Sequence, residues 1–277
     1  MMSYKTILVH SDAGRNWPAR LELALALAHR HDAHLIGLHA PKAAAMSGLL
    51  LGGLAPELAE ALQQARAEQA AQAETRFNQA VAAAGVNHAE WRQGDQDAVA
   101  SLVTNARYVD LLVLGQRDPA ELEGFDRDFV EQVVLAAGRP VLLLPYAGRF
   151  ESVGRQALVA WDGSREAARA LTDALPLLRQ ADKVKLITIN PKASRHGELP
   201  GADIGLYLAR HGVRIEVVAD RGDGIDVGNE LLSRAADFGS DLIVMGAYGH
   251  ARMKELVMGG ATRTILDSMT VPTLLSH

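Results

Sequence analysis

The sequence contains two copies of one pattern, and this repeat restricts the fold more than any other feature. Short apolar runs that end in an aspartate, a glycine or a Pro-containing turn recur in the same order in both halves. The matching blocks are residues 7–12 with 157–162, 85–86 with 212–213, 110–115 with 241–246, and 139–143 with 271–275. Self-similarity over such a distance predicts two copies of one structural unit.

The two copies differ in length at one place. The first copy is about 23 residues longer, and the extra residues lie between its second apolar run and Gly85. Much of that length falls in residues 56–84, a segment rich in Ala, Gln and Glu with high helix propensity, which predicts an extended second helix. We therefore expect one domain over residues 1–148 and a second over residues 153–277, joined by a linker near Tyr146 to Gly154.

Within each copy, runs rich in Val, Ile and Leu alternate with segments of helical periodicity, which is typical of βαβ units. The apolar runs are nearly continuous, as expected for parallel strands that helices cover on both faces. The predicted fold class is α/β, with two tandem Rossmann-like, doubly wound domains that each contain a five-stranded parallel sheet. In the second copy we expect strands near residues 156–161, 183–190, 213–219, 240–246 and 272–276, and helices near 164–178, 201–211, 225–239 and 258–269.

Composition excludes several classes of function. The 277 residues include no cysteine, which excludes disulfides, thiolate metal sites and cysteine nucleophiles. The 28 basic and 33 acidic side chains leave a net charge of −5, so no overall positive field exists to attract nucleic acid or a membrane surface. The longest apolar patch, residues 46–54, is too short to cross a bilayer, and residues 1–9 lack the apolar core of a signal peptide. We expect a cytoplasmic protein.

The segment after the fourth predicted strand of the second copy is a candidate anion site. Gly246 and Gly249 allow a tight turn that exposes backbone amides, and a glycine pair opens the helix that follows. Amides at a helix N-terminus, aided by the helix dipole, favour an anion such as phosphate. The candidate residues here are Met245, Gly246, Tyr248, Gly249, Gly259, Gly260, Ala261 and Thr262.

Asp162 follows the first predicted strand of the second copy and has two interpretations. With Ser164 it could cap the next helix, because Asp and Ser commonly precede helices. In open parallel sheets, however, ligands bind beyond the carboxyl ends of strands where the strand order reverses. If strands one and four are neighbours, Asp162 lies across a crevice from the glycine loop, where its carboxylate could accept a hydrogen bond from an adenine amino group.

The pattern Gly246-x2-Gly249-x9-Gly259, together with Asp162 and the tandem repeat, resembles the universal stress protein family in its two-domain form. The resemblance covers nearly the whole chain. It implies that the second half binds ATP, alone or with Mg²⁺, or a related adenine nucleotide. By this resemblance, adenine would meet Asp162 and the backbone of Ile189; the ribose and phosphates would meet Met245, Gly246, Tyr248 and Gly249; and the phosphates would rest on Gly259, Gly260, Ala261 and Thr262.

This sequence departs from the family pattern at Gly260. Members that bind ATP have Ser or Thr directly after the last glycine of the motif. The hydroxyl donor that is lost here is worth about 0.5–1.5 kcal/mol if nothing replaces it. Thr262 and the cations Arg252, Lys254 and Arg263 could compensate, or the affinity for nucleotide could be weak.

The first copy departs further from the pattern. Its strand-four turn reads Gly115, Gln116, Arg117 and Asp118, and the matching helix start has neither glycine nor hydroxyl. Asp126 and Asp128 near that helix start would repel phosphate. We expect that the first half does not bind a nucleotide through this loop, and that Asp12 caps a helix.

Two further features of the first half carry open alternatives. His29, His31, His34 and His39 could bind zinc, or could simply stabilise the end of a helix. The apolar loop at residues 46–54 could be a partner surface or a lid, or could pack against the long helix.

Three functions remain open at the level of sequence. The first is a stress-response protein whose second half binds an adenine nucleotide as a regulatory ligand, with no catalytic or metal-ligating residue and at most slow ATP hydrolysis. The second is an interaction module without nucleotide, in which the two halves pair and the strand-five edges form a homodimer. The third is a phosphotransferase or hydrolase, which only the glycine loop favours.

Overall fold

The computed structural model of the chain describes residues 3–12, 14–40, 56–94, 97–120, 128–190, 201–220, 226–249 and 260–277. The first half contains β1 (Thr6–Ser11), α1 (Trp17–His31), β2 (His34–His39), α3 (Pro56–Ala84), β3 (Ala89–Gln93), α4 (Ala98–Ala106), β4 (Leu111–Gly115), α5 (Phe129–Ala136) and β5 (Val141–Leu144). The second half contains β6 (Gln156–Ala160), α6 (Arg165–Leu178), β7 (Lys183–Ile189), α8 (Ala202–Arg210), β8 (Ile215–Asp220), α9 (Val227–Asp237), β9 (Leu242–Gly246), α10 (Gly260–Ser268) and β10 (Thr273–Ser276).

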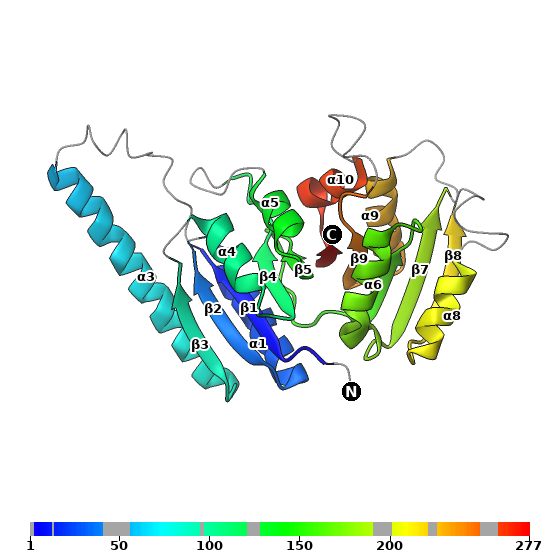
Figure 1. Ribbon diagram of the computed structural model, residues 1–277, viewed down its shortest axis with the longest axis horizontal. Coiled ribbons are helices and arrows are strands. Elements are labelled where there is room, and N and C mark those ends of the chain that lie inside the picture. The colour runs from blue at the N-terminus through cyan, green and yellow to red at the C-terminus, as the bar shows by residue number, and fades with distance from the viewer. Residues whose placement is uncertain are drawn as a thin grey trace.

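The strands form one continuous sheet in the order β3-β2-β1-β4-β5-β10-β9-β6-β7-β8 (Figure 1). Within each half the paired strands are parallel, and strand order reverses between β1 and β4 and between β6 and β9. This arrangement confirms the predicted α/β class with two doubly wound units.

The two halves join through their fifth strands. β10 pairs with β5 in antiparallel orientation, with Leu274 opposite Leu142. The expectation that the strand-five edges form a homodimer is therefore wrong. The backbone groups of β5 and β10 already form hydrogen bonds with each other within one chain, so neither edge is open to a second copy. Further contacts support the junction: the Tyr4 hydroxyl donates to the Asp173 carbonyl at 2.8 Å, and the Gln116 side chain donates to the Leu266 carbonyl at 2.9 Å.

Helices cover both faces of the sheet, which explains why the strands are nearly continuously apolar. Successive strand residues alternate between two buried clusters, so that Ile7 and Val9 face one side while Leu8 faces the other. One cluster includes residues of α1, α3, α6 and α8, and the other includes residues of α4, α5, α9 and α10. Both clusters contain residues from both halves, so each core continues across the β5–β10 junction.

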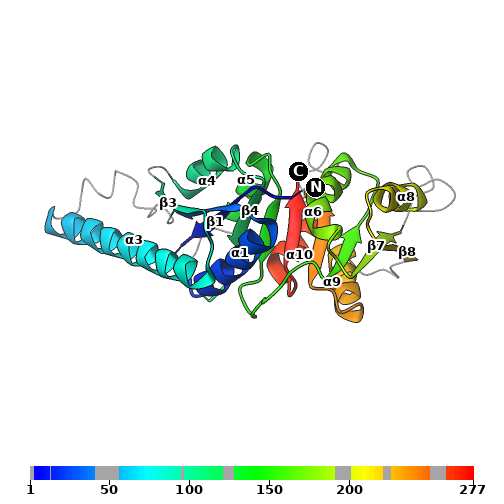
Figure 2. The same cartoon turned by 90° about the horizontal axis from the view of Figure 1, so that it is seen from below.

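Helix α3 occupies the segment for which the sequence predicts a long helix. The described side chains between residues 60 and 69, which leave out residue 62, are exposed, and the C-terminal part of the helix is anchored by the buried Phe77. Figures 1 and 2 show the N-terminal part of α3 extending past the edge of the sheet. Among the described segments, no helix combines the length and the apolar character needed to span a membrane.

The expectation that Asp12 caps a helix is wrong. Helix α1 begins at Trp17 and has Asn16 in the N-cap position. Asp12 Oδ1 instead accepts hydrogen bonds from the Gly14 amide at 3.0 Å and from Arg20 Nη2 at 2.7 Å. Arg20 is only 2% exposed, and a buried guanidinium requires a counter-charge, which Asp12 supplies.

Candidate functional site

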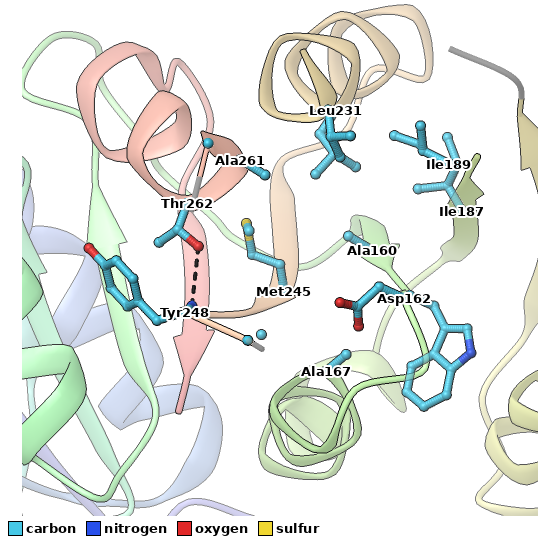
Figure 3. A pocket seen from close by; sticks show the side chains of 15 residues that line it. Ala160, Asp162, Ala167, Ile187, Ile189, Leu231, Met245, Tyr248, Ala261 and Thr262 are labelled. Carbon is cyan, nitrogen blue, oxygen red and sulfur yellow. Dashed lines mark hydrogen bonds between the residues drawn. The ribbon is translucent and has the colours of Figure 1, made fainter. Parts of the chain in front are cut away.

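A cavity of about 320 Å³ lies beyond the carboxyl ends of β6 and β9, at the point where the strand order of the second half reverses. This is the place where open α/β sheets bind ligands, and the volume lies within the usual range for small-molecule sites. The residues that line it are Ala160, Trp161, Asp162, Ala167, Ile187, Ile189, Val227, Leu231, Met245, Gly246, Tyr248, Gly249, Gly260, Ala261 and Thr262 (Figure 3).

Nine of the ten binding residues expected from the sequence line this one cavity, although they come from four separate segments of the chain. The tenth, Gly259, lies outside the described residues, as do Arg252 and Lys254. Proximity of the strand-one aspartate and the strand-four glycine loop follows from the pairing of β6 with β9.

Six lining residues were not expected, and some have a signal in the sequence that could have identified them. Ile187 lies two residues before Ile189 and therefore points to the same face of β7. Val227 and Leu231 are four residues apart and share one face of α9. Only the structure shows that this face of α9, rather than another helix, closes the cavity. The other unexpected residues are Ala160, Trp161 and Ala167.

The cavity has an apolar side and a polar side. In Figure 3, Leu231, Ile187 and Ile189 gather on one side, while the carboxylate of Asp162 points into the cavity between Ala160 and Ala167. Such a combination suits a flat heteroaromatic ring, because apolar side chains can pack on its faces while one carboxylate accepts a hydrogen bond from its edge.

The structure confirms that the segment after β6 caps α6, while ligand binding by Asp162 stays a prediction. Ser164 is the N-cap of α6, and its Oγ accepts a hydrogen bond from the Ala167 amide at 3.1 Å. Asp162 Oδ1 accepts from the Ser164 amide at 2.9 Å, which fixes the carboxylate. Among the described residues no hydrogen bond reaches the second oxygen of Asp162, so this oxygen can still accept from a ligand.

The glycine turn after β9 is shaped by a close approach to α6. A Cβ atom at Gly246 would lie 2.4 Å from the Ala167 amide nitrogen and 2.6 Å from the Glu166 carbonyl carbon, so only glycine fits there. Tyr248 follows with a φ of 55°, in the left-handed region that non-glycine residues rarely adopt.

A hydrogen bond holds Tyr248 in this conformation. The Tyr248 amide donates to Thr262 Oγ1 at 3.3 Å and thereby ties the turn to the first turn of α10 (Figure 3). The aromatic ring of Tyr248 is buried and points away from Asp162, so Tyr248 offers the cavity its backbone rather than its ring. Because Thr262 Oγ1 is the acceptor in this bond, its own hydroxyl proton remains to be donated.

The equivalent crevice of the first half is filled by side chains of the chain itself. His10 stands where the second half has Ala160, and its Nε2 donates to the Ala40 carbonyl at 2.8 Å. The ring of Phe129, from the start of α5, lies 5.6 Å from the His10 ring. Burial lowers the pKa of His10 to about 4, so its ring is neutral near pH 7. Arg20 lies against Gly115, where an added Cβ atom would be 2.0 Å from Nη1.

The strand-four turn of the first half has other partners. Asp118, which stands where the second half has Gly249, pairs with Arg15, and the hydrogen bond from Arg15 holds the pKa of this carboxyl below its usual value. The Gln116 side chain accepts from the Tyr146 amide at 3.1 Å and also contacts the second half. These contacts agree with the expectation that the first half binds no nucleotide here, which stays a prediction. Asp126 and residues 46–54 lie outside the described segments.

The four clustered histidines do not converge. His31 contacts Ser3 and the ring of Tyr4, His34 faces Glu90 at 3.8 Å, and His39 stacks on Trp91. No group of three potential ligands close enough to hold a metal ion occurs in the described parts of the chain. The zinc interpretation therefore has no geometric support there.

The family model described as the universal stress protein family matches the chain twice, over residues 3–145 and 155–277. A curated relative, universal stress protein Slr1230 from Synechocystis sp., is 24% identical over 171 residues, which are 60% of this chain and 57% of that protein. The chain thus spans little more than half the length of the curated relative it matches.

Two solved structures share the fold over nearly the whole chain. The first is a universal stress protein from Archaeoglobus fulgidus, with a TM-score of 0.75 and 18% identity, covering 98% of this chain and 95% of that one. The second is described as a putative universal stress protein from Pseudomonas aeruginosa, with a TM-score of 0.58 and 14% identity, covering 99% of this chain and 93% of that one.

Proposed function

Because the chain belongs to the universal stress protein family and carries the family unit in each half, we propose that its second half binds ATP or a related adenine nucleotide as a regulatory ligand. The observation that carries this proposal is the cavity at the carboxyl ends of β6 and β9, where Asp162, the glycine turn and the start of α10 meet.

Adenine would occupy the apolar side of the cavity. Ile187, Ile189 and Leu231 supply surfaces that pack against a flat ring, and Met245 adds a polarisable side chain. The fixed carboxylate of Asp162 would accept a hydrogen bond from the exocyclic amino group. A guanine ring has no donor at that position, so this contact favours adenine.

The sugar and phosphate would extend toward the turn and α10. Gly249 and Gly260 let the backbone approach the ligand closely, and the phosphate would accept from amides of the first turn of α10, since the first amides of a helix have no partner within that helix. The Thr262 hydroxyl supplies a donor near the position where the family pattern has Ser or Thr after the last glycine.

A regulatory ligand fits the site better than a substrate. Of the described lining residues, Asp162 alone carries a carboxylate, and one of its oxygens accepts a hydrogen bond from the amide of Ser164 while the other would meet the adenine edge. General acid–base catalysis requires a titrating group positioned on the reacting atoms. We therefore propose binding with at most slow hydrolysis of ATP.

Calorimetric titration tests this proposal. The wild-type protein should bind adenosine and an adenine nucleotide. Asp162→Ala should weaken binding about tenfold, since a hydrogen bond to a charged acceptor is lost. Gly249→Val should abolish nucleotide binding, because the valine side chain would fill part of the cavity.

Asp97→Ala is the matched control. Asp97 also accepts a hydrogen bond from a nearby amide, that of Ala100, but it lies in the first half. Absence of heat with both adenosine and ATP at millimolar concentration would contradict the proposal.

A second candidate is an interaction module without nucleotide. The side chains that occupy the crevice of the first half and the β5–β10 junction favour it, because both are contacts of the chain with itself. Purified protein without absorbance from a co-purified nucleotide would favour this candidate. An adenine nucleotide released on denaturation would count against it.

Other expectations from the sequence stay proposals. These are the domain limits at residues 1–148 and 153–277, a requirement for Mg²⁺, a homodimer through surfaces other than the strand-five edges, and a cytoplasmic location.

A further inference from the structure

We propose that the cavity of the second half selects adenine ligands that carry little negative charge, namely adenosine, AMP or a cyclic monophosphate, over ADP and ATP. This inference rests on the proposed function and names the class of ligand more narrowly. The phosphates would bind near Gly249 and Gly260. The basis of the inference is that a carboxylate lies close to each of these two glycines.

The first carboxylate is that of Asp226, at the start of α9. Asp226 Oδ2 accepts hydrogen bonds from the amides of Gly228 at 3.0 Å and Asn229 at 3.3 Å, and so caps α9. Asp226 Oδ1 faces α10, since a Cβ atom at Gly260 would lie 3.0 Å from it. Within the described segments no cation forms an ion pair with this carboxylate. The N-terminus of α10, where a phosphate would bind, therefore already has a negative group beside it.

This contact also bears on the glycine at position 260. A side chain there would place its Cβ atom 3.0 Å from Asp226 Oδ1, so the Asp226 side chain would have to shift by a few tenths of an ångström to accept Ser or Thr. The site lacks the hydroxyl donor of Ser or Thr at position 260, and it has the carboxylate of Asp226 beside this position. Both differences make the site less favourable for phosphate.

The second carboxylate is that of Glu166, below the turn after β9. Glu166 is 4% exposed, and its Oε2 lies 3.6 Å from the position of a Cβ atom at Gly249. Oε1 pairs with Arg165, while Oε2 has no hydrogen-bond partner among the described residues. Burial raises the pKa of Glu166, but the hydrogen bonds from Arg165 and from a backbone amide, together with the nearby charges of Arg165 and His277, hold the pKa below its usual value, which favours the charged form.

The two carboxylates act most strongly on ligands with several phosphates. Like charges a few ångströms apart repel each other, and the repulsion grows where water is excluded. Adenosine adds no charge to this end of the cavity, a monophosphate adds one or two, and a triphosphate adds about four. On α10 itself, the cation Arg263 is oriented toward Asp267, at 3.8 Å.

Titration calorimetry with adenosine, AMP, cyclic AMP and ATP in the absence of Mg²⁺ tests the inference. The wild-type protein should bind AMP at least tenfold more tightly than ATP. Asp226→Asn retains a residue that caps helices well but removes the charge. Asp226→Asn should raise the affinity for ATP about tenfold and leave the affinity for adenosine unchanged.

Asp97→Asn is the control. It changes the same kind of N-cap, on α4, and should alter neither the affinity for ATP nor the affinity for adenosine. Thermal melting should show both variants folded.

The outcomes separate the inference from the proposed function. If ATP binds as tightly as AMP, or if Asp226→Asn leaves the ratio of the two affinities unchanged, the charge selectivity is wrong while nucleotide binding stands. If none of the four compounds binds to the wild-type protein, both proposals fail.

Discussion

At the residue scale, two packing contacts determine the shape of the cavity wall. The absence of a side chain at Gly246 lets the end of β9 lie directly against the first turn of α6. The bond between Tyr248 and Thr262 then turns the chain toward α10 in a left-handed conformation. Because these contacts involve backbone atoms, neighbouring side chains cannot relieve a change by choosing another rotamer.

Gly246→Ala should therefore destabilise the protein. The added Cβ atom would lie 2.4 Å from a backbone nitrogen, and we expect a loss of about 2–3 kcal/mol in the free energy of unfolding. Gly138→Ala is the comparison, because Gly138 has a φ of 62° but open space around it, and only the strain of about 1 kcal/mol applies. Urea unfolding measures both values. Equal losses would show that the approach of β9 to α6 is not tight.

At the element scale, the buried contacts of α3 among the described side chains lie in its middle and C-terminal part. Phe77 is buried against Trp91, with ring centroids 5.2 Å apart, and both rings occupy the space that a side chain at Gly37 would fill. The side chains described between residues 60 and 69 are exposed instead. The length of this helix therefore reflects intrinsic propensity in one part and packing in the other.

Phe77→Ala should separate these contributions. Removing a fully buried aromatic ring costs about 3–5 kcal/mol of unfolding free energy. Arg66→Ala, in the exposed part of the same helix, should change it by less than about 0.5 kcal/mol. Chemical denaturation followed by circular dichroism gives both values. A small effect of Phe77→Ala would mean that α3 is not anchored through this ring.

At the scale of the whole molecule, the two family units form one structural body. The sheet is continuous across β5 and β10, and both buried clusters include residues from each half. Unfolding of one half would expose the edge strand and part of the core of the other. Cooperative loss of both halves is therefore favoured over stepwise unfolding.

Differential scanning calorimetry should consequently show one transition. The calorimetric and van't Hoff enthalpies should agree, as they do for a two-state transition. Leu274→Ala, at the junction, should lower the temperature of that single transition. Two resolved transitions in the wild-type protein would contradict the prediction.

Two buried histidines should make the folded protein less stable as the pH falls below about 6.5. Burial lowers the pKa of His10 and of His31 from 6.5 to about 4. The unfolded chain therefore binds more protons than the folded one between these values, so stability is full above pH 6.5 and is lost as the pH falls toward 4. From pH 7.5 to pH 5.0 we expect a loss of about 2 kcal/mol for each histidine.

The His31→Gln variant checks this pH dependence. The difference between the free energies of unfolding at pH 7.5 and at pH 5.0 should become smaller by about 2 kcal/mol, because His10 and His39, whose pKa burial also lowers, remain. His88→Gln, an exposed change, should leave the difference unaltered. Identical pH dependence of the wild-type protein and His31→Gln would contradict the assignment.

The sequence by itself determined the two-unit α/β architecture and the location of the cavity. Both follow from the conformational preferences of short segments of the sequence. Apolar runs define strands, and a glycine after a strand or an aspartate before a helix has few conformations available. In a parallel sheet the strand ends with such residues meet at one edge. The sequence pattern therefore predicts that Asp162, Gly246 and Thr262 lie at the same edge of the sheet.

The tertiary structure alone decided how these elements are covered. Periodicity shows which face of an element is buried, but not which neighbour buries it. The sequence therefore did not show that β10 pairs with β5 or that α9 closes the cavity with Val227 and Leu231. Nor did it show that His10, Arg20 and Phe129 fill the first crevice, or that Asp226 lies against Gly260. Each of these contacts joins residues that are distant along the chain, and only the packing of the complete fold brings them together.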